Sequence, residues 1–494
     1  MKMRNYLSID LGATSGRSIV ATFDGERITM RELTRFDNPM LPIGEHIFWN
    51  LPALYNEVLK AIRLTVTEGI EIESIGIDTW GCDVAMFAKD GALLGLPYCY
   101  RDHQTEGAME KLFERIPSKE VYEHSGIQFM PFNTIFQLDT MKRRQVEALE
   151  NADKVLFIPD ALAYMLTGRA VCEYTVASTS QLTNPRNEEI DPVLLDAIAL
   201  RRNQFGEMVQ PATLVGTLRE EVQRYTGADA IKVVAVAGHD TASAVIAVPS
   251  LAEHFAYLSC GTWSLMGIES KEPIINEESY AKNFTNEGGI DHTTRFLKNI
   301  CGLWLFERCR KEFDSAPASV AELAALCMQS DCEALINPDA PIFANPDSMT
   351  AAIQQYCHAT KQQAPVTPAD YCRCIFRSLA LRYKQIIGWL EELSHRPIEV
   401  LNVIGGGSQN VYLMQFTANA INRTVICGPT ECTALGNALV QMRADNVVGD
   451  LAAMRRISAA SVALKEYQPA DVAEWEALYD KFIEIQELEK QSNL

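Results

Sequence analysis

One short pattern occurs twice in this chain, once near the start and once near the middle. Residues 6–17 read YLSIDLGATSGR, and residues 257–264 read YLSCGTWS. Each copy is a strand-like run that leads into a glycine turn with hydroxyl side chains. One such turn alone is equally well a polar β-hairpin, but its recurrence in both halves indicates a repeated structural unit. The pair therefore predicts a duplicated fold that holds one phosphorylated ligand from two sides.

The residue types in the two turns suit phosphate binding. Glycine lets the backbone approach a ligand closely, and successive backbone N–H groups form a nest for an anion. Thr14, Ser15 and Thr262 add hydroxyl donors, and Arg17 adds charged ones. Asp10 would repel phosphate directly, so we expect it to act through a cation such as Mg²⁺.

Length and charge restrict the class of protein. A chain of 494 residues is too long for one ordinary core, so two domains are expected. The formal net charge of −20 argues against a nucleic-acid partner, which needs clustered Lys and Arg. The sequence contains no apolar run long enough to span a membrane and no signal-peptide pattern after Met1, so a cytoplasmic location is expected.

The 13 cysteines do not form a recognisable pattern. Cys372 and Cys374 are one residue apart and His358 follows Cys357, but this spacing is weak support for a zinc site. Most of the thiols are expected to be small buried apolar groups.

The order of expected elements describes a mixed sheet with helices. Strands are expected at residues 6–10, 17–23, 28–36, 72–78, 84–87, 233–237, 255–259, 264–268 and 400–404, and helices at 51–67, 242–248, 300–313, 320–329, 372–394 and from 470 onward. Residues 175–181 are expected to form a polar loop.

Gly238-His239-Asp240 is expected at a strand-to-helix turn. The N–H groups of the helix start would keep an aspartate there ionised near neutral pH. Such a carboxylate suits a general base that takes a proton from a substrate hydroxyl, although this motif alone favours a plain helix cap.

Two further sets of residues suggest ligand contacts. Gly405-Gly406-Gly407 follows a strand and leaves room for a flat group such as adenine, whereas no Walker motif is present. Residues 79–83 and 100–103 place Trp80 and Tyr100 beside charged side chains, a lining that fits a polyol and equally an ordinary core. Residues 285–289 and Asn299 are polar positions after the second turn.

These motifs together resemble the FGGY carbohydrate kinases of the actin/hexokinase/Hsp70 superfamily, and within that family the rhamnulokinase branch. The similar segments span nearly the whole chain: residues 10–17, 74–81, 96–102, 125–129, 131–134, 238–245, 259–267, 285–289, 297–300, 302–305 and 405–410. The resemblance implies two α/β domains of the actin-like (ribonuclease H-like) type, an N-terminal one at 1–246 and a C-terminal one at 247–494, with the active site in a cleft between them.

The resemblance also implies roles for individual residues. Asp240 would be the catalytic base, and Asp10 would hold Mg²⁺ through water. The sugar site would comprise Gly81, His239, Asp240, Thr241 and Asn299. The ATP site would comprise Ala13, Thr14, Ser15, Gly16, Arg17, Thr262, Glu307 and Gly406. Glu307 stands where similar enzymes are expected to carry Gln, so its contact is in doubt.

The implied reaction is transfer of the ATP γ-phosphoryl group to the C1 hydroxyl of L-rhamnulose, in L-rhamnose catabolism. Alternatives are another ketose, such as L-fuculose or L-xylulose, or a non-catalytic sugar sensor on the same fold. The expected partners are ATP and the sugar, in a monomer or homodimer.

Overall fold

The computed structural model describes residues 3–250, 252–313 and 319–492. Contacts divide the chain into two compact units, neither of which is continuous in sequence. Unit 1 comprises Met1–Pro249, Glu269–Phe296 and Glu431–Ser461, and unit 2 comprises Ser250–Ile268, Leu297–Thr430 and Val462–Leu494. The sequence domains 1–246 and 247–494 stay a prediction.

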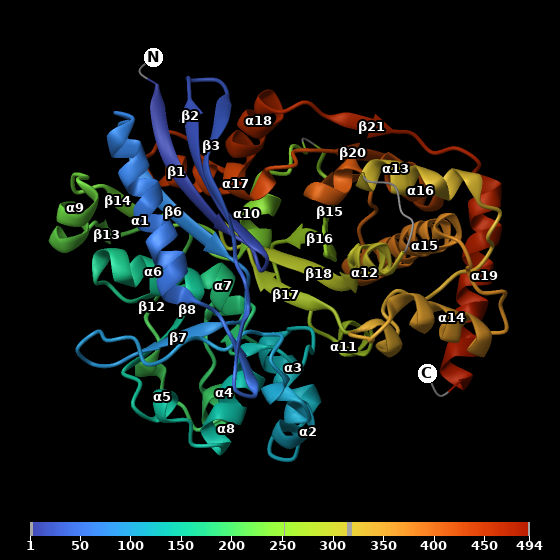
Figure 1. Cartoon of the computed structure of the whole chain (residues 1–494), viewed down its shortest axis with the longest axis horizontal. Helices are drawn as coiled ribbons and strands as arrows, with labels where there is room; N and C mark the ends of the chain where they lie inside the picture. Colours follow the sequence, from blue (N-terminus) through green and yellow to red (C-terminus); the bar gives the residue numbers. More distant parts are fainter. Residues whose placement is uncertain (1–2, 251, 314–318, 493–494) are drawn as a thin grey trace. The chain divides into compact units, whose positions relative to one another are not determined.

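Unit 1 is built on a six-stranded sheet with the order β13-β14-β6-β1-β2-β3 (Figure 1). Its strands are β1 (Arg4–Leu11), β2 (Ser15–Phe23), β3 (Ile28–Asp37), β6 (Ser74–Thr79), β13 (Thr213–Thr217) and β14 (Lys232–Ala235). β1 runs antiparallel to β2 and parallel to β6, and β6 runs parallel to β14. The expected N-terminal antiparallel run is therefore present, followed by a parallel centre.

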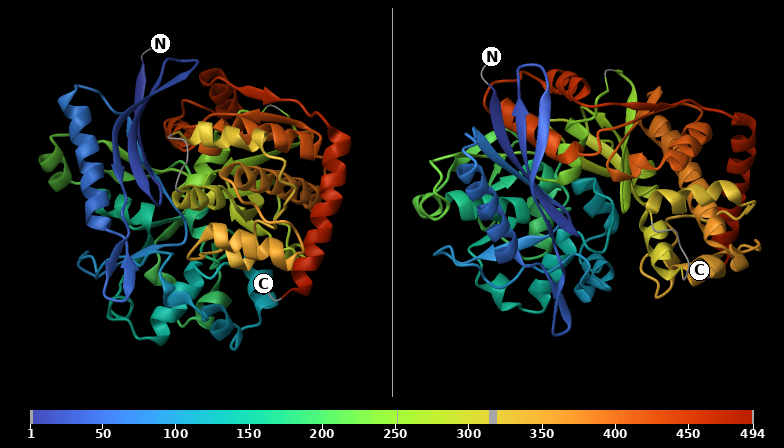
Figure 2. Two further views of the ribbon diagram at one scale, coloured as in Figure 1. Left: turned by 45° about the vertical axis from the view of Figure 1, so that its right-hand side comes forward. Right: turned by 45° about the horizontal axis from the view of Figure 1, so that its top comes forward.

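The first helix, α1 (Leu51–Thr67), forms over the expected residues. Asn50 caps it by accepting a hydrogen bond from Ala53 N at 3.2 Å, and a proline occupies its first turn. Leu54, Val58 and Ile62 form a buried stripe at helical spacing. In the left view of Figure 2, α1 lies alongside the blue strands of the sheet.

A helix from the far end of the sequence, α17 (Cys432–Ala444), completes unit 1 by packing on β1 and β6. Its Gln441 Nε2 donates to Leu7 O at 3.2 Å, and Ser74 Oγ donates to Gln441 Oε1 at 2.7 Å. Gly76 permits this approach, because a Cβ there would lie 2.4 Å from Asn437 Oδ1. These buried polar contacts explain why residues 431–461 belong to unit 1.

The remaining elements of unit 1 are mostly short. They are β4 (Leu41–Ile43), β5 (His46–Phe48), β7 (Val84–Phe87), α2 (Ala108–Phe113), α3 (Ser118–Ser125), α4 (Thr134–Arg143), α5 (Glu147–Glu150), β8 (Lys154–Phe157), α6 (Ile158–Thr167), β9 (Val171–Glu173), α7 (Tyr174–Ser178), β10 (Thr183–Asn184), β11 (Glu189–Ile190), α8 (Pro192–Ala197), β12 (Glu207–Val209), α9 (Glu220–Thr226), α10 (Asp240–Ile246), α11 (Glu277–Ala281), β17 (Thr285–Gly288) and α18 (Leu451–Ser461). The prediction of a loop at 175–181 was wrong over α7, because Glu173 caps a helix there. The many hydroxyl side chains of this segment had favoured a loop.

Unit 2 repeats the strand order of the first sheet. β15 (Phe255–Cys260) runs antiparallel to β16 (Trp263–Ser270) and parallel to β19 (Val400–Ile404), which is parallel to β20 (Thr424–Cys427). β18 (Thr294–Cys301) and β21 (Lys465–Tyr467) extend the two sides, and the short strand β17 lies beyond β18, which gives the order β17-β18-β16-β15-β19-β20-β21. Apart from the edge strand β17, this order matches β3-β2-β1-β6-β14-β13, so the expected duplication is confirmed.

The helices of unit 2 are α12 (Trp304–Glu312), α13 (Val320–Ala325), α14 (Met349–Ala359), α15 (Pro368–Ser394), α16 (Val411–Ile421) and α19 (Val472–Gln491). The expected helix at 300–313 was wrong at its start, because β18 continues to Cys301 before α12 begins. The expected helix from 470 onward is α19, which buries Trp475, Phe482 and Ile485.

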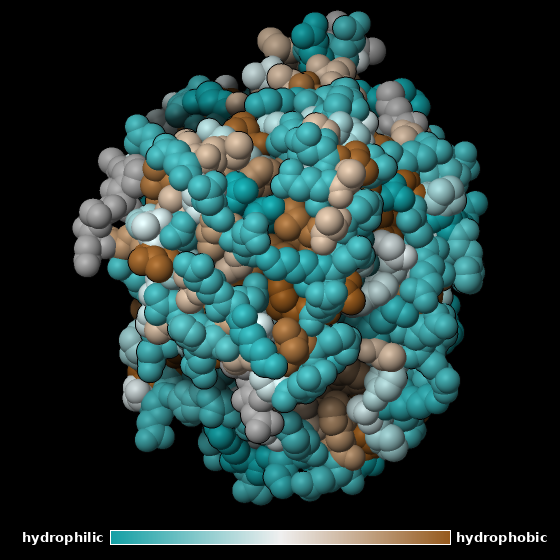
Figure 3. Space-filling view, turned by 90° about the vertical axis from the view of Figure 1, so that its right-hand side faces the viewer, coloured by the Kyte–Doolittle hydropathy of each residue, from teal (hydrophilic) through white to brown (hydrophobic). Residues whose placement is uncertain are grey.

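The surface over α19 is mostly hydrophilic, with scattered apolar side chains (Figure 3).

All 13 cysteines are free thiols, and 11 of them are buried, which confirms the expectation for most of them. Within the described ranges, no group of three or more His, Cys, Asp or Glu side chains is arranged to hold a metal ion. The described helices include none with the length and apolar character needed to cross a membrane.

Candidate active site

Three aspartates lie at the carboxyl ends of three neighbouring parallel segments in unit 1. Asp10 ends β1 and is directly opposite Asp78 of β6 in the strand register. Beyond β6, Thr79 N donates to Gly238 O at 2.9 Å, which fixes the turn before Asp240 against the same strand. Ligand sites of open α/β sheets form at this edge. The fold therefore gathers carboxylates from three distant parts of the sequence.

Asp10 forms an ion pair with Arg17, which is opposite it on β2. Arg17 Nη2 and Nε lie 2.6 and 2.9 Å from Asp10 Oδ2. Arg17 Nη1 also contacts the carboxylate of Glu431, at the N-terminus of α17. The guanidinium that sequence reasoning assigned to phosphate is thus held by two carboxylates in this structure.

The first glycine turn is closed by its own backbone and by Asn38. Gly12 N donates to Ser15 O at 2.9 Å, and Asn38 donates through N to Thr14 O and through Nδ2 to Gly12 O, both at 3.0 Å. Ala13 and Gly16 belong to the same turn. Asn38 was not singled out from the sequence, because nothing local marks it as a brace.

Asp78 is fully buried beneath this turn. Asn437 Nδ2 donates to its Oδ2 at 2.5 Å. Burial and the neighbouring Asp10 carboxylate raise the pKa of Asp78 well above its usual range. Asp78 therefore holds a proton more readily than an exposed aspartate. The sequence motif around it was noticed, but no role was derived.

Asp240 is the first residue of α10, and His239 occupies the cap position. Its Oδ1 accepts a hydrogen bond from Thr241 N at 2.5 Å and lies 3.1 Å from Thr241 Oγ1. Burial raises the pKa of Asp240, His239 opposes part of this rise, and Asp10 adds to it. The shift is opposite to the one expected from the helix N-terminus alone, because burial outweighs the effect of a short helix.

His239 connects Asp240 to a buried ion pair. Its Nε2 lies 3.4 Å from Asp240 Oδ1, and its Nδ1 lies 3.3 Å from both Glu287 Oε2 and Arg295 Nη2. Arg295 is 1% exposed and lies 3.1 Å from Glu287. Burial acts to raise the pKa of Glu287, but Arg295 and His239 outweigh it and hold this pKa below its ordinary value. Sequence reasoning noticed Glu287 only as part of a polar segment and missed Arg295.

Gly81 lies in a tightly packed loop after β6. A Cβ at Gly81 would approach Thr179 Oγ1 to 2.8 Å, and Thr179 Oγ1 also accepts a hydrogen bond from Cys82 N at 3.0 Å. Cys82 has a φ of 71°, a left-handed conformation that these contacts maintain.

The aromatic side chains near Gly81 are anchored by one buried carboxylate, Asp83. Its Oδ2 accepts hydrogen bonds from Trp49 Nε1 at 2.6 Å, Trp80 Nε1 at 2.9 Å and Tyr100 N at 3.1 Å, and its Oδ1 accepts one from Gln137 at 2.8 Å. Burial raises the pKa of Asp83 to about 6 despite these donors. The predicted pairing of Trp80 and Tyr100 with charge is therefore real, although both rings also belong to the packed interior.

Unit 2 brings together the second glycine turn and the glycine run. Gly261 N donates to Trp263 O at 2.9 Å, and Trp304 N at the start of α12 donates to Thr262 O at 3.1 Å. A Cβ at Gly407 would approach Cys260 Sγ to 2.3 Å, so the run 405–407 packs closely against the end of β15. Nothing lies within 4 Å of the Cβ position of Gly406.

Glu307 lies on α12, the helix that starts beside Thr262. Its Oε2 accepts hydrogen bonds from Arg310 Nη2 at 2.7 Å and Nε at 3.1 Å. Asn299 is half-buried on β18. The structure thus associates Thr262 and Glu307 with one helix start.

Comparisons with known proteins agree with this geometry. Residues 5–247 match the N-terminal domain of the FGGY family of carbohydrate kinases, and residues 256–444 match its C-terminal domain. The chain belongs to the FGGY family of carbohydrate kinases. It is 51% identical over 484 residues to a rhamnulokinase from Bacteroides thetaiotaomicron (97% of this chain and 99% of the relative), and 41% identical to one from Pectobacterium atrosepticum (98% and 96%).

Solved structures support the same fold for this carbohydrate kinase. A gluconate kinase and a xylulose kinase, both from Lactobacillus acidophilus, each have a TM-score of 0.83 at 16% identity, with 98% of each chain covered. A Plasmodium falciparum glycerol kinase has a TM-score of 0.78 at 15% identity, covering 100% of this chain and 99% of its own. The fold class expected from the sequence is confirmed.

Proposed function

We propose that this carbohydrate kinase transfers the γ-phosphoryl group of ATP to the C1 hydroxyl of L-rhamnulose, giving L-rhamnulose 1-phosphate and ADP. The observation that carries the proposal is the position of Asp240, beside His239 and near Asp10, at the edge where the parallel strands of unit 1 end. The rhamnulokinases to which the chain is 51% and 41% identical support the choice of sugar.

Asp240 acts as the base in this proposal. A general base works best when its pKa lies close to the working pH, and the burial of Asp240 moves its pKa in that direction. It would accept the proton of the sugar hydroxyl as the oxygen attacks phosphorus. His239, supported by Glu287 and Arg295, would hold Asp240 and the sugar in position.

The two glycine turns would hold the nucleotide. Backbone N–H groups and hydroxyls of Ala13, Thr14, Ser15, Gly16 and Thr262 are suited to phosphate oxygens, and Gly406 leaves open space for adenosine. Arg17 would exchange the carboxylate of Glu431 for phosphate. Glu307 would approach the nucleotide with its side chain already paired to Arg310.

Mg²⁺ fits the donors that this site offers. Mg²⁺ is usually bound by one or two carboxylates together with waters and substrate phosphates. Asp10 supplies one carboxylate, and both hydrogen bonds from Arg17 go to its Oδ2. When bound, Mg²⁺ would neutralise phosphate charge next to Asp10.

Gly81, His239, Thr241 and Asn299 are the proposed sugar contacts. Ketoses differ in only a few hydroxyl groups, so few contacts decide between them. We expect Asp83 and the residues that donate to it, Trp49, Trp80, Tyr100 and Gln137, to determine the selectivity for the sugar. A cytoplasmic location and a monomeric or homodimeric state complete the proposal.

The proposal is tested with a panel of ketoses. ADP release is measured for L-rhamnulose, L-fuculose and L-xylulose, and ³¹P and ¹³C NMR locate the phosphate on the product. We expect the highest kcat/KM for L-rhamnulose and phosphate on C1. A higher kcat/KM for another ketose would transfer the assignment to that sugar, and sugar binding without turnover would favour the sensor alternative.

A further inference from the structure

We propose that Glu173, together with Thr175, is a positioning residue that fixes the turn presenting Asp240. Neither residue belongs to the site derived above. The inference rests on the proposed function, because it assumes that Asp240 is the base.

Glu173 is a buried residue at the end of β9 and caps α7. Its Oε1 accepts a hydrogen bond from Thr175 N at 2.9 Å, and its Oε2 accepts from Val176 N at 3.1 Å and Thr175 Oγ1 at 2.7 Å. These three hydrogen bonds lie within the first turn of α7 and fit a residue that only caps the helix. A fourth donor comes from elsewhere in the sequence: Gly238 N, at 2.9 Å from Oε2.

That fourth bond reaches the turn before Asp240. The next backbone N–H, of His239, donates to Thr175 Oγ1 at 3.3 Å. On the other side, the carbonyl of Gly238 accepts the bond from Thr79 N. The backbone at Gly238 is thus held on one side by Glu173 and Thr175, at the start of α7, and on the other side by Thr79 of β6. Because Asp240 follows only two residues later, its carboxylate takes its direction from these bonds.

Steric contacts enforce the same position. A Cβ at Gly238 would lie 3.0 Å from Glu173 Oε2 and 3.2 Å from Pro159 Cγ. A side chain at position 238 would therefore require Glu173 or Pro159 to shift.

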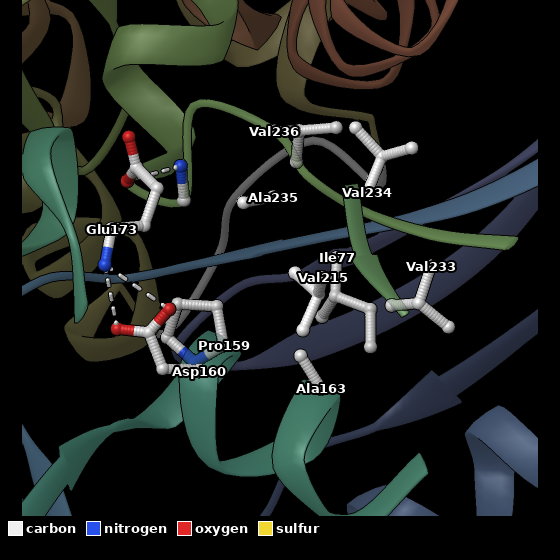
Figure 4. Close-up of a pocket in the computed structure, with 11 residues that line it drawn as sticks. Ile77, Pro159, Asp160, Ala163, Glu173, Val215, Val233, Val234, Ala235 and Val236 are labelled. Atoms are coloured by element: carbon white, nitrogen blue, oxygen red, sulfur yellow. Dashed lines mark hydrogen bonds between the residues drawn. The ribbon is translucent and has the colours of Figure 1, made fainter. Parts of the chain in front are cut away.

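A second buried carboxylate, Asp160, lies below Glu173 (Figure 4). Its two oxygens lie 3.1 and 3.3 Å from Glu173 N. It borders a cavity of about 10 Å³ whose other walls are mostly apolar, including Ile77, Val215 and Val233. Burial and the charge of Glu173 raise the pKa of Asp160 well above its usual range. Burial also raises the pKa of Glu173, but its four hydrogen-bond donors oppose that rise, so we expect Asp160 to hold a proton more readily than Glu173.

The expected functional effect is on turnover. A displacement of about 1 Å at a reacting group can lower a rate by about 10²-fold. Glu173→Gln removes the negative charge and places an NH₂ group either against Thr175 N or against the three donors at Oε2, so the hydrogen bond from Gly238 N is weakened or lost. We expect kcat to fall by about 10–100-fold, whereas the Kd of ATP stays within about twofold.

The test compares this variant with a matched cap elsewhere in unit 1. Asp191 is buried and caps α8 by accepting hydrogen bonds from Val193 N and Leu194 N, and its Oδ2 contacts His124 and Asn184, neither of which is a proposed site residue. Asp191→Asn should lower the melting temperature without lowering kcat. If Glu173→Gln and Asp191→Asn lower the melting temperature similarly and leave kcat equally unchanged, Glu173 is only a cap and the proposal is wrong.

Thr175 supplies a milder pair of variants that does not depend on the carboxylate. Thr175→Val removes the hydroxyl between Glu173 and His239 N, and Thr175→Ser retains it. We expect Thr175→Val to lower kcat by at least about fivefold and Thr175→Ser to restore it. Equal kcat values for the two variants would overturn the proposal even if Glu173→Gln fails to fold.

A double variant separates this inference from the proposed function. If Glu173 acts through Asp240, adding Glu173→Gln to Asp240→Asn should lower the remaining rate by less than about threefold. If Glu173→Gln lowers the rate by the same factor with and without Asp240→Asn, the positioning role of Glu173 is contradicted but the proposed function is not. Near-normal turnover of Asp240→Asn by itself would instead contradict the proposed function.

Discussion

The two sheets of this kinase share one order of six strands but carry different residues where their parallel strands end. In unit 1 these ends are acidic, and in unit 2 they are small. In unit 1 they are Asp10 and Asp78, in the last two residues of β1 and β6, and Asp240, which follows β14 at the start of α10. In unit 2 they are Cys260, the last residue of β15, and Gly405 and Gly428, which directly follow β19 and β20. The first set can accept protons and attract a cation, whereas the second lets backbone approach a ligand. Duplication thus supplied two similar scaffolds, and the strand ends distinguish their chemistry.

Asp10→Asn is the variant with the largest expected effect among the tests of this contrast. It removes the charge opposite Arg17 and the proposed cation contact, so we expect kcat to fall by about 10²–10³-fold. The matched change in the second turn, Thr262→Ala, should mainly raise the KM of ATP. Steady-state kinetics check both, and equal losses of kcat would show that the acidic end has no special role.

The packing of the two units can be compared with two helical glycines. A Cβ at Gly436 of α17 would lie 1.7 Å from Ser243 O of α10, whereas nothing lies within 4 Å of the Cβ position of Gly388 in α15. Gly436→Ala should lower the free energy of unfolding by about 3 kcal/mol, because one of the helices must move. Gly388→Ala should raise it by about 1 kcal/mol. Urea unfolding measures both, and a neutral Gly436→Ala would contradict the close crossing in unit 1.

Gly406 tests whether the small strand ends of unit 2 serve the nucleotide. The added methyl group of Gly406→Ala meets no protein atom within 4 Å, so the melting temperature should not change. If adenosine lies there, the KM of ATP should rise about tenfold, equivalent to about 1.4 kcal/mol. An unchanged KM would remove Gly406 from the ATP site, and a lowered melting temperature would contradict the open space.

The last test of the comparison concerns Lys298, a buried cation of unit 2. Burial and the nearby Arg382 lower the pKa of Lys298 to about 8. Between about pH 8 and 10 the unfolded chain therefore binds more protons at this residue than the folded chain, and stability rises with pH by up to about 1.4 kcal/mol per unit. Lys298→Met should remove this contribution. Unfolding curves of both proteins at pH 8 and 10 provide the check, and identical pH slopes would contradict it.

The fold was largely predictable because its elements are marked locally. The helix at 51–67 has a capping Asn50 and an apolar stripe, and the glycine turns are visible in the sequence. One error arose where a side chain just outside the motif decides the structure. Glu173 caps a helix in a hydroxyl-rich segment that was predicted to be a loop.

The site was predictable where chemistry and motif coincide, as at Asp10 and Asp240. It was not predictable where burial or long-range pairing sets the role. Asp78 depends on Asn437, and His239 depends on Glu287 and Arg295, none of which lies near its partner in sequence. The direction of the pKa shift at Asp240 was missed for the same reason, because burial is a property of the folded chain.

The central claim is that the acidic strand ends of unit 1 perform the phosphoryl transfer, with Asp240 as the base. Its most direct test is the rate of L-rhamnulose 1-phosphate formation by Asp240→Asn, with ATP binding measured by calorimetry. We expect this rate to fall by about 10³-fold or more, whereas the Kd of ATP stays within about threefold. A rate within tenfold of the wild type, with ATP binding intact, would contradict the claim.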